Sequence, residues 1–244
     1  MNKKLGIIGG MGPKATASFM DKIINYTEAT KDQDHIDMVI LNHATLPDRT
    51  KCILNQTGEL FLQAIQPDIH YLESAGVDNI AIPCNTSHYY YEELQAMTDI
   101  NIIHMVQETT QYIQRMFGSG SKVAILATDG TIASGVYENQ CKAHNLFPFV
   151  PDTNLQKHVM NLIYNIKADA TYEGEELDEI IQYLVSKEKC TSIILGCTEL
   201  STVSLKTSSQ AYCIDPMNIL VEQSIIQSGK QLTQPVNTHF IINS

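Results

Sequence analysis

One short pattern occurs twice in this chain, and it constrains the possible folds more than any other feature. In the first copy, the largely apolar run 79–83 ends in Cys84, and the polar run 85–87 follows. In the second copy, the run 192–196 ends in Cys197, and a threonine follows. Short apolar runs are typical of buried strands, whereas Asn, Ser and Thr are favoured at helix N-caps. The pattern predicts two thiols at equivalent strand ends, each beside the start of a helix.

Strand patterns alternate with helical patterns along the chain, and this alternation predicts a parallel α/β architecture. Strands are expected at 4–9, 37–44, 79–84, 100–104, 122–128, 147–151, 192–197 and 211–215. Helices are expected at 14–30, 58–75, 88–97, 106–117, 129–144, 155–167, 173–187 and 217–229. A last strand-like stretch, 238–242, has no predicted partner.

The Gly-Ser-Gly segment 118–120 marks a domain boundary, because the alternation restarts after it. We therefore predict an α/β fold with two similar open parallel-sheet domains related by pseudo-symmetry. The first domain comprises residues 1–105 plus 216–244, and the second comprises residues 106–215. Open parallel sheets bind ligands at the carboxyl ends of their strands. We therefore expect the active site between the domains, with one thiol on either side of a single ligand.

Charge and composition restrict the partners of this protein. The 244 residues carry a formal net charge of −11, and the sequence pI is near 5.1. This charge argues against nucleic acid and against an anionic membrane surface as partners. The sequence shows no signal-peptide pattern and no apolar run of about 18 residues, so we expect a cytoplasmic protein.

The cysteine spacing predicts neither a metal site nor a redox dithiol. The six cysteines include no C-x-x-C pair. A single cysteine is most often a small buried apolar residue, and we interpret Cys52, Cys141, Cys190 and Cys213 in this way. The matched surroundings of the other two cysteines favour a chemical role for them.

A glycine-rich turn follows the first predicted strand. Residues 10–15 fit the G-x-G-x-x-A pattern of dinucleotide-binding folds, but Asn42 and His43 stand where an acidic partner would be expected. The chain contains no phosphate-binding P-loop sequence. We therefore interpret the turn around Met11 and Gly12 as a close backbone approach to a small ligand, in preference to a nicotinamide cofactor site.

Several charged or titratable residues have both a functional and a structural interpretation. Arg49, in the loop after the second strand, could grip a carboxylate in a bidentate manner or extend into solvent. Lys167 ends a helix, where a cation is favourable for structural reasons alone. Glu199 could serve as a local base or as an acidic residue in the first turn of a helix. His88 and His104 lie near strand ends and could be bases or satisfied polar residues.

A series of short motifs carries a resemblance to a known family. In order along the chain they are Gly9-Gly-Met-Gly-Pro13, Pro47-Asp-Arg-Thr50, Pro83-Cys-Asn-Thr86, Ala127-Thr-Asp-Gly-Thr131, Ser134-Gly-Val-Tyr137, Gly196-Cys-Thr-Glu199 and Ile214-Asp-Pro-Met217. In this combination the chain resembles the aspartate racemase branch of the aspartate/glutamate racemase superfamily. The resemblance implies two α/β domains with pseudo-mirror symmetry, a homodimer, and racemisation of a small acidic amino acid without pyridoxal phosphate, metal or any other cofactor.

The resemblance also assigns roles to residues. Cys84 and Cys197 correspond to the catalytic thiols of the family, Arg49 and Lys167 to its carboxylate-binding cations, and Asp48 and Glu199 to the acidic residues beside the thiols. The full set of expected substrate-binding residues is Met11, Gly12, Asn42, Asp48, Arg49, Asn85, Thr86, Thr128, Thr131, Lys167, Thr198 and Glu199.

The chemistry of racemisation agrees with a pair of thiols. A proton must leave Cα from one face and return to the other, and two groups on opposite faces achieve this without rotating the ligand. A helix N-terminus lowers the pKa of a neighbouring thiol, so we expect thiolate to be available near neutral pH. Alternatives are a glutamate or broad-specificity racemase, a one-thiol decarboxylase or cis–trans isomerase of the same superfamily, and an amino-acid-binding protein without turnover.

Overall fold

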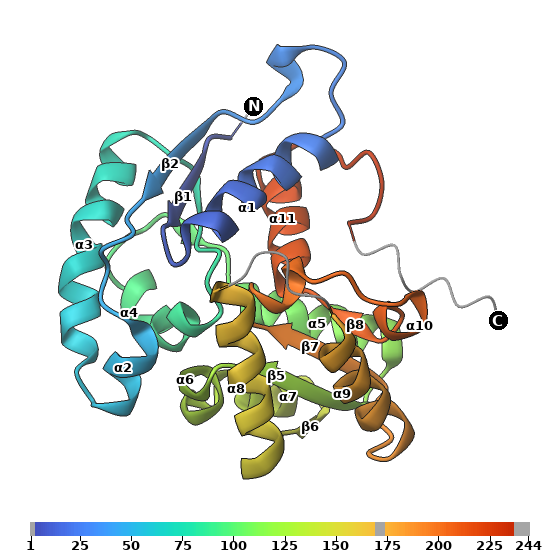
Figure 1. Ribbon diagram of the computed structural model, residues 1–244. Coiled ribbons are helices and arrows are strands. Elements are labelled where there is room, and N and C mark those ends of the chain that lie inside the picture. The colour runs from blue at the N-terminus through green and yellow to red at the C-terminus, as the bar shows by residue number, and fades with distance from the viewer. Residues whose placement is uncertain (1–2, 169–173, 237–244) are drawn as a thin grey trace. The chain divides into compact units, whose positions relative to one another are not determined.

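The computed structural model describes residues 3–168 and 174–236 (Figure 1). The chain divides into two compact units, the first formed by Met1–Glu108 with Met217–Val236 and the second by Thr109–Pro216. Each unit contains one four-stranded parallel sheet. The strand predicted at 238–242 lies outside the described residues.

The sheet of the first unit has the strand order β2-β1-β3-β4. Its strands are β1 (Leu5–Gly9), β2 (Met38–Asn42), β3 (Asn79–Ala81) and β4 (Asn101–Ile102). The central strand β1 is buried along its whole length, as expected for a parallel strand that is covered on both faces. Gly9 of β1 pairs with Asn42 of β2, so the loops after these two strands leave the sheet at the same edge.

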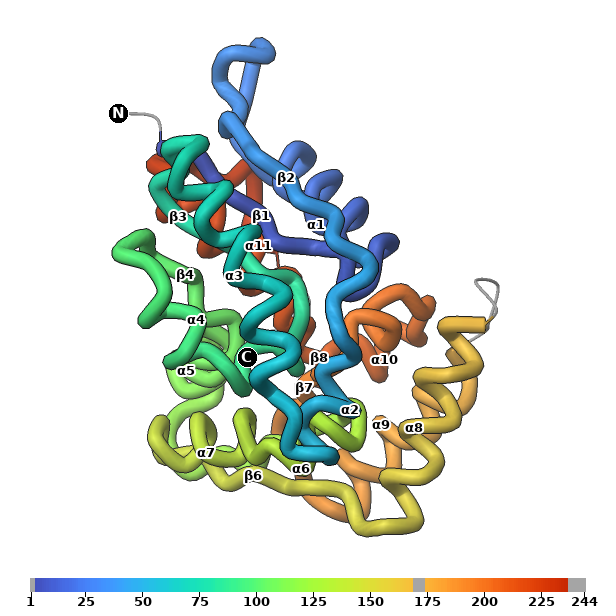
Figure 2. Tube along the Cα trace, turned by 90° about the vertical axis from the view of Figure 1, so that its left-hand side faces the viewer, coloured from blue at the N-terminus to red at the C-terminus, as the bar shows by residue number. Residues whose placement is uncertain are grey.

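Helices cover both faces of this first sheet. They are α1 (Pro13–Tyr26), α2 (Arg49–Leu54), α3 (Gly58–Ser74), α4 (Tyr91–Gln95) and α11 (Pro216–Gln227). A further helix, α5 (Met105–Phe117), contains the boundary between the units. Ile8 of β1 packs with α3 in one core cluster, whereas its neighbour Ile7 packs with α1 and α11 in another. Figures 1 and 2 show α3 on one side of this sheet and α1 with α11 on the other. The alternation follows from the two-residue period of a strand.

The sheet of the second unit repeats this strand order as β6-β5-β7-β8. Its strands are β5 (Lys122–Ala127), β6 (Phe147–Phe149), β7 (Ser192–Gly196) and β8 (Cys213–Ile214). Its helices are α6 (Asp129–Ser134), α7 (Val136–Ala143), α8 (Thr153–Ala168), α9 (Glu175–Ser186) and α10 (Thr207–Gln210). Ala124, Leu126, Ile193 and Leu195 form a core with α8 and α9. The expectation of two similar open parallel sheets is confirmed.

The structure differs from the expected helices and loops in several places. Arg49, expected in a loop, is the first residue of α2. The helix expected at 129–144 is interrupted by Gly135, whose φ of 66° is the left-handed conformation that ends helices. Residues 88–90, expected to begin an α-helix, belong to a 3₁₀ helix, η2 (Thr86–Tyr90), and the α-helix begins only at Tyr91. The turn after Cys197 leads into a short 3₁₀ helix, η3 (Leu200–Thr202). Asn85 makes no side-chain capping bond, so the expected N-cap does not form there. Neither cysteine therefore precedes the N-terminus of an α-helix directly.

Within residues 3–168 and 174–236, no helix combines the length and the apolar character that a membrane-spanning segment requires.

Candidate active site

The turn after β3 holds Cys84 in a buried position. Cys84 is 6% exposed, and its backbone N–H donates to the carbonyl oxygen of Ile82 at 2.7 Å. The neighbouring Asn85 and Thr86 are also buried. A hydrogen bond from Ser87 Oγ to Met11 Sδ, 3.3 Å long, joins this turn to the glycine-rich turn after β1. The structure thus brings the predicted site residues Met11 and Cys84 onto neighbouring loops at the carboxyl edge of the first sheet.

Close packing explains two of the glycines in the turn after β1. A Cβ atom on Gly9 would lie 2.3 Å from the side chain of Thr16, and Gly10 has φ +92° close to the backbone of His43. Thr16 Oγ1 accepts a hydrogen bond from Gly10 N at 2.8 Å and donates to the Gly12 carbonyl at 3.0 Å. A Cβ on Gly12, by contrast, would meet no atom of residues 3–168 or 174–236 within 4 Å. Gly12 is therefore the position in this turn where a small ligand could approach the backbone.

The loop after β2 fixes Arg49 through backbone carbonyls. Its Nη1 donates to the carbonyl oxygens of Leu46 at 3.3 Å and Pro47 at 2.8 Å, while its buried Nε has no hydrogen-bond partner among the described residues. Asp48 caps α2 by accepting a bond from Lys51 N at 2.8 Å. Asn42 is exposed at the end of β2. These contacts give Asp48 a structural role and leave donors of Arg49 available for a ligand.

The turn after β7 brings together predicted site residues in one hydrogen-bonded network. Cys197 Sγ lies 2.7 Å from Glu199 Oε2, and Thr198 Oγ1 donates to the same oxygen at 3.3 Å. Lys167, at the end of α8, places its Nζ 3.4 Å from Glu199 Oε1. Cys197 and Thr198 are buried, whereas Lys167 is exposed. The carboxylate of Glu199 thus links the thiol to the ammonium group.

The electrostatics of this network hold Cys197 in its thiol form. Burial raises the pKa of Cys197 well above its ordinary value of 9.0, and the charge and hydrogen bond of Glu199 raise it further, while Lys167 opposes the change. The expectation that a helix N-terminus lowers the pKa of this thiol is therefore wrong for Cys197. A carboxylate faces the sulfur, and no α-helix begins directly after it.

The neighbours of Cys197 offer a direct test of this electrostatic description. Replacing Glu199 with Gln keeps an oxygen acceptor but removes the negative charge, so the pKa of Cys197 should fall. Alkylation of Cys197 by iodoacetamide at pH 8, followed by mass spectrometry, should become about tenfold faster, because only thiolate reacts. Replacing Lys167 with Met should slow the same reaction. Equal rates in the two variants would contradict the assignment.

Two predicted threonines lie at the carboxyl end of β5. Thr128 caps α6 by accepting a hydrogen bond from Thr131 N at 3.3 Å, and the two hydroxyl oxygens are 3.1 Å apart. Ala127 of β5 pairs with Gly196 of β7. Thr128 and Cys197 therefore leave adjacent strands at the same edge of the second sheet. The structure thus gives Thr128 a capping role in addition to the expected ligand contact.

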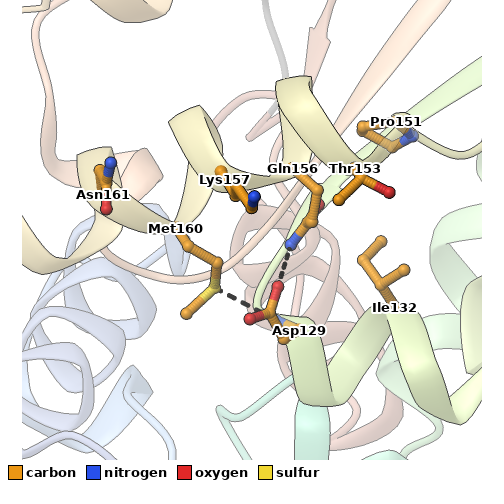
Figure 3. Close-up of a pocket in the computed structure, with 8 residues that line it drawn as sticks. All are labelled: Asp129, Ile132, Pro151, Thr153, Gln156, Lys157, Met160 and Asn161. Atoms are coloured by element: carbon orange, nitrogen blue, oxygen red, sulfur yellow. Dashed lines mark hydrogen bonds between the residues drawn. The ribbon is translucent and has the colours of Figure 1, made fainter.

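A pocket of about 400 Å³ lies at the same edge, between α6 and α8 (Figure 3). Gln156 Nε2 donates to Asp129 Oδ1 at 2.8 Å and to the Ala127 carbonyl at 3.0 Å, while the buried Gln156 Oε1 has no hydrogen-bond partner in the part of the chain that the structure describes. Met160 and Lys157 also line the pocket. Sequence reasoning missed these residues, because polar side chains on one face of α8 have the pattern of an ordinary exposed helix face.

No group of three or more His, Cys, Asp or Glu side chains in the described ranges, 3–168 and 174–236, is arranged to hold a metal ion.

Two parallel-sheet units with the same strand order define an α/β protein of two similar halves, and each half holds a buried cysteine beyond the equivalent strand. Comparison with known proteins makes the family explicit. The chain belongs to the Asp/Glu/Hydantoin racemase family, whose model matches residues 8–224. The family resemblance of the short motifs is thereby confirmed.

Individual relatives agree with this assignment. A broad specificity amino-acid racemase of Bacillus subtilis, RacX, is 31% identical over 225 residues, which cover 91% of this chain and 96% of the relative. The aspartate racemase of Picrophilus torridus has a solved structure with 30% identity and a TM-score of 0.80, covering 96% of this chain and 97% of that one. The glutamate racemase of Francisella tularensis, solved with D-glutamate, shares the fold at 17% identity and a TM-score of 0.64, covering 96% and 84% of the two chains.

Proposed function

We propose that this protein is a cofactor-independent amino-acid racemase that interconverts L- and D-aspartate by proton transfer between two cysteines. One observation carries the proposal: Cys197 is a buried thiol held 2.7 Å from the Glu199 carboxylate, and Cys84 lies beyond the equivalent strand of the first unit. A thiol stabilised in its protonated form is suited to donate a proton to a carbanion. In this proposal Cys84 acts as the base.

The proposed reaction balances in one exchange of protons. The Cys84 thiolate removes the Cα proton, so the C–H bond breaks, an S–H bond forms, and the electron pair moves into the α-carboxylate. The Cys197 thiol then donates its proton to the opposite face of Cα and becomes a thiolate. The reverse direction uses the same two groups in exchanged roles. Lys167, which pairs with Glu199, and the guanidinium of Arg49 are proposed to stabilise the growing negative charge.

A broader substrate range is the second candidate. RacX of Bacillus subtilis, by its name, has broad specificity, and it is about as similar to this chain as the Picrophilus aspartate racemase. The positive charge of Lys167 is partly neutralised by its ion pair with Glu199. A compensated cation selects less strongly for a second substrate carboxylate than an uncompensated one. This observation favours activity on neutral amino acids in addition to aspartate.

Incubation of the purified protein with each L- and D-amino acid in D₂O tests the function and the substrate together. Chirality is followed by chiral chromatography and Cα deuterium by mass spectrometry, without added pyridoxal phosphate or metal and after dialysis against a chelator. Inversion of aspartate should be accompanied by one deuterium at Cα, because the returned proton comes from a thiol that has exchanged with solvent.

The other outcomes separate the alternatives. Inversion of neutral amino acids at comparable rates would favour the broad-specificity candidate. Loss of carbon dioxide or isomerisation of a double bond would indicate a decarboxylase or a cis–trans isomerase. Binding without deuterium incorporation would indicate an amino-acid-binding protein and would overturn the racemase proposal.

A further inference from the structure

His88 is a buried histidine whose ring contacts two backbone carbonyls. It lies in η2 and is 3% exposed. Its Nδ1 is 2.9 Å from the carbonyl oxygen of Cys84, and its Nε2 is 3.4 Å from the carbonyl oxygen of Ile103. Ile103 directly follows β4, and its N–H donates to Ile80 of β3 at 2.8 Å. The imidazole therefore bridges the two chain segments that leave the carboxyl ends of β3 and β4.

The 3₁₀ winding of η2 explains why the ring is needed there. In an α-helix, the backbone N–H of residue 88 would donate to the carbonyl of residue 84. In this structure the N–H of His88 donates instead to Asn85 O at 3.1 Å, the shorter spacing of a 3₁₀ helix. The ring Nδ1 thus supplies the Cys84 carbonyl with the hydrogen bond that the backbone of His88 does not supply. A buried carbonyl without a partner is costly, so this contact holds the Cys84 peptide in place.

The two distances also favour one of the two ring nitrogens of His88 as the site of the proton. Burial lowers the pKa of His88 below its ordinary value of 6.5, although the two carbonyl contacts oppose this effect. The ring is therefore neutral at pH 7 and has a single N–H. An unprotonated Nδ1 and the Cys84 carbonyl oxygen would be two acceptors 2.9 Å apart and would repel one another. The lone pair of an unprotonated Nε2 is tolerated more easily, because the Ile103 carbonyl oxygen is 3.4 Å away. The proton accordingly resides on Nδ1, which donates to the Cys84 carbonyl.

Aromatic contacts hold the ring of His88 in this orientation. The ring of His104 stacks on it with a centroid distance of 5.5 Å and an interplanar angle of 29°. Tyr91 packs against His104 at 4.0 Å. The other backbone polar group of Cys84, its N–H, donates a hydrogen bond to the carbonyl oxygen of Ile82. Both backbone polar groups of Cys84 are thus hydrogen-bonded, and this restrains the backbone from which its sulfur projects.

We propose that His88 is a positioning residue for Cys84: its Nδ1–H fixes the Cys84 carbonyl and thereby the direction in which the sulfur faces Cα of the substrate. This inference rests on the proposed role of Cys84 as a proton carrier. His88 itself does not exchange protons with the substrate. Its contribution is to keep the thiol within the narrow geometry that proton transfer from carbon requires.

Two amide substitutions of His88 separate the contribution of each ring nitrogen. The amide nitrogen of Asn is as many bonds from Cα as Nδ1 of His, whereas that of Gln matches Nε2. His88→Gln should lower kcat on the order of 100-fold with KM changed less than about threefold, because the thiol is misplaced. His88→Asn should restore kcat to within about tenfold of the wild type, because it can still donate to the Cys84 carbonyl.

His104→Phe is the matched control, since it keeps a ring for stacking and removes both nitrogens. Its kcat should stay within about threefold of the wild type. A loss as large as that of His88→Gln would show that the ring nitrogens of His104, and not the hydrogen bond from His88, are what the activity requires, and would overturn the inference. Equal kcat values for His88→Asn and His88→Gln would overturn it as well.

Alkylation provides a measurement that is independent of turnover. In His88→Gln, iodoacetamide should modify Cys84 about tenfold faster than in the wild type, because the turn opens locally, while Cys197 reacts at an unchanged rate. His88→Asn should leave both rates close to the wild type. If the wild-type protein racemises no amino acid, the proposed function fails, yet the alkylation rates still decide whether His88 fixes Cys84. Unchanged alkylation of Cys84 in a folded His88→Gln protein would overturn the inference.

Discussion

Replacing either Cys84 or Cys197 with serine is expected to lower racemisation by roughly 1,000-fold or more. An unactivated hydroxyl is a far weaker acid and base than a thiol, so each substitution removes one of the two proton carriers. The double variant should be little slower than either single variant, because one deletion already breaks the exchange. The measurement is the rate of inversion of each aspartate enantiomer, followed by chiral chromatography.

A substrate with a leaving group at Cβ distinguishes the two thiols. The remaining cysteine can still remove the Cα proton that faces it in those molecules in which it is deprotonated, and a β-chloro amino acid then loses chloride without any proton being returned. Cys84→Ser and Cys197→Ser should therefore eliminate chloride from opposite enantiomers. Normal racemisation by either variant, or elimination of the same enantiomer by both, would rule out the two-thiol mechanism.

Cys213→Ser is a suitable control for these variants. Burial raises the pKa of Cys213 to about 12, so it remains a thiol, and its Sγ donates to the Ser209 carbonyl at 3.4 Å. A serine hydroxyl can make the same bond. We expect racemisation by Cys213→Ser to stay within about threefold of the wild type, with any change confined to stability.

Arg49→Ala is expected to lower kcat/KM for aspartate by roughly 30- to 1,000-fold, the loss of a charge-assisted contact worth about 2–4 kcal/mol in the transition state. The guanidinium is already oriented by the carbonyls of Leu46 and Pro47, so little entropy should be lost when it binds a carboxylate. Steady-state kinetics with both enantiomers measures the effect.

Two further variants show whether geometry or charge matters at this position. Arg49→Lys keeps the charge but not the planar fork, and it should recover only part of the activity. Lys51→Ala removes an exposed cation from the same helix and should leave kcat/KM within about threefold. A folded Arg49→Ala protein as active as Lys51→Ala would exclude carboxylate binding by Arg49. Thermal unfolding of each variant detects damage to the loop.

Much of the fold follows from the sequence alone. The repeated apolar runs and their helical connections were sufficient to predict two parallel sheets, because hydrophobic periodicity is a local property of the chain. The positions of Cys84 and Cys197 beyond equivalent strands followed from the same repeat. The family followed from short motifs in a fixed order, and the comparison with known proteins confirmed it.

Only the tertiary structure determines the ion pairs, hydrogen bonds and pKa values of the groups around the thiols. The ion pair between Lys167 and Glu199 joins the end of α8 to the turn after β7, and no local pattern encodes such a contact. The sequence suggested a low thiol pKa from capping residues, whereas burial and a facing carboxylate produce the opposite shift at Cys197. His88 was ambiguous until its ring was seen to occupy the position of a missing helical bond to Cys84. Propensity and periodicity act over a few neighbouring residues, but pKa and side-chain orientation depend on groups that only folding brings together.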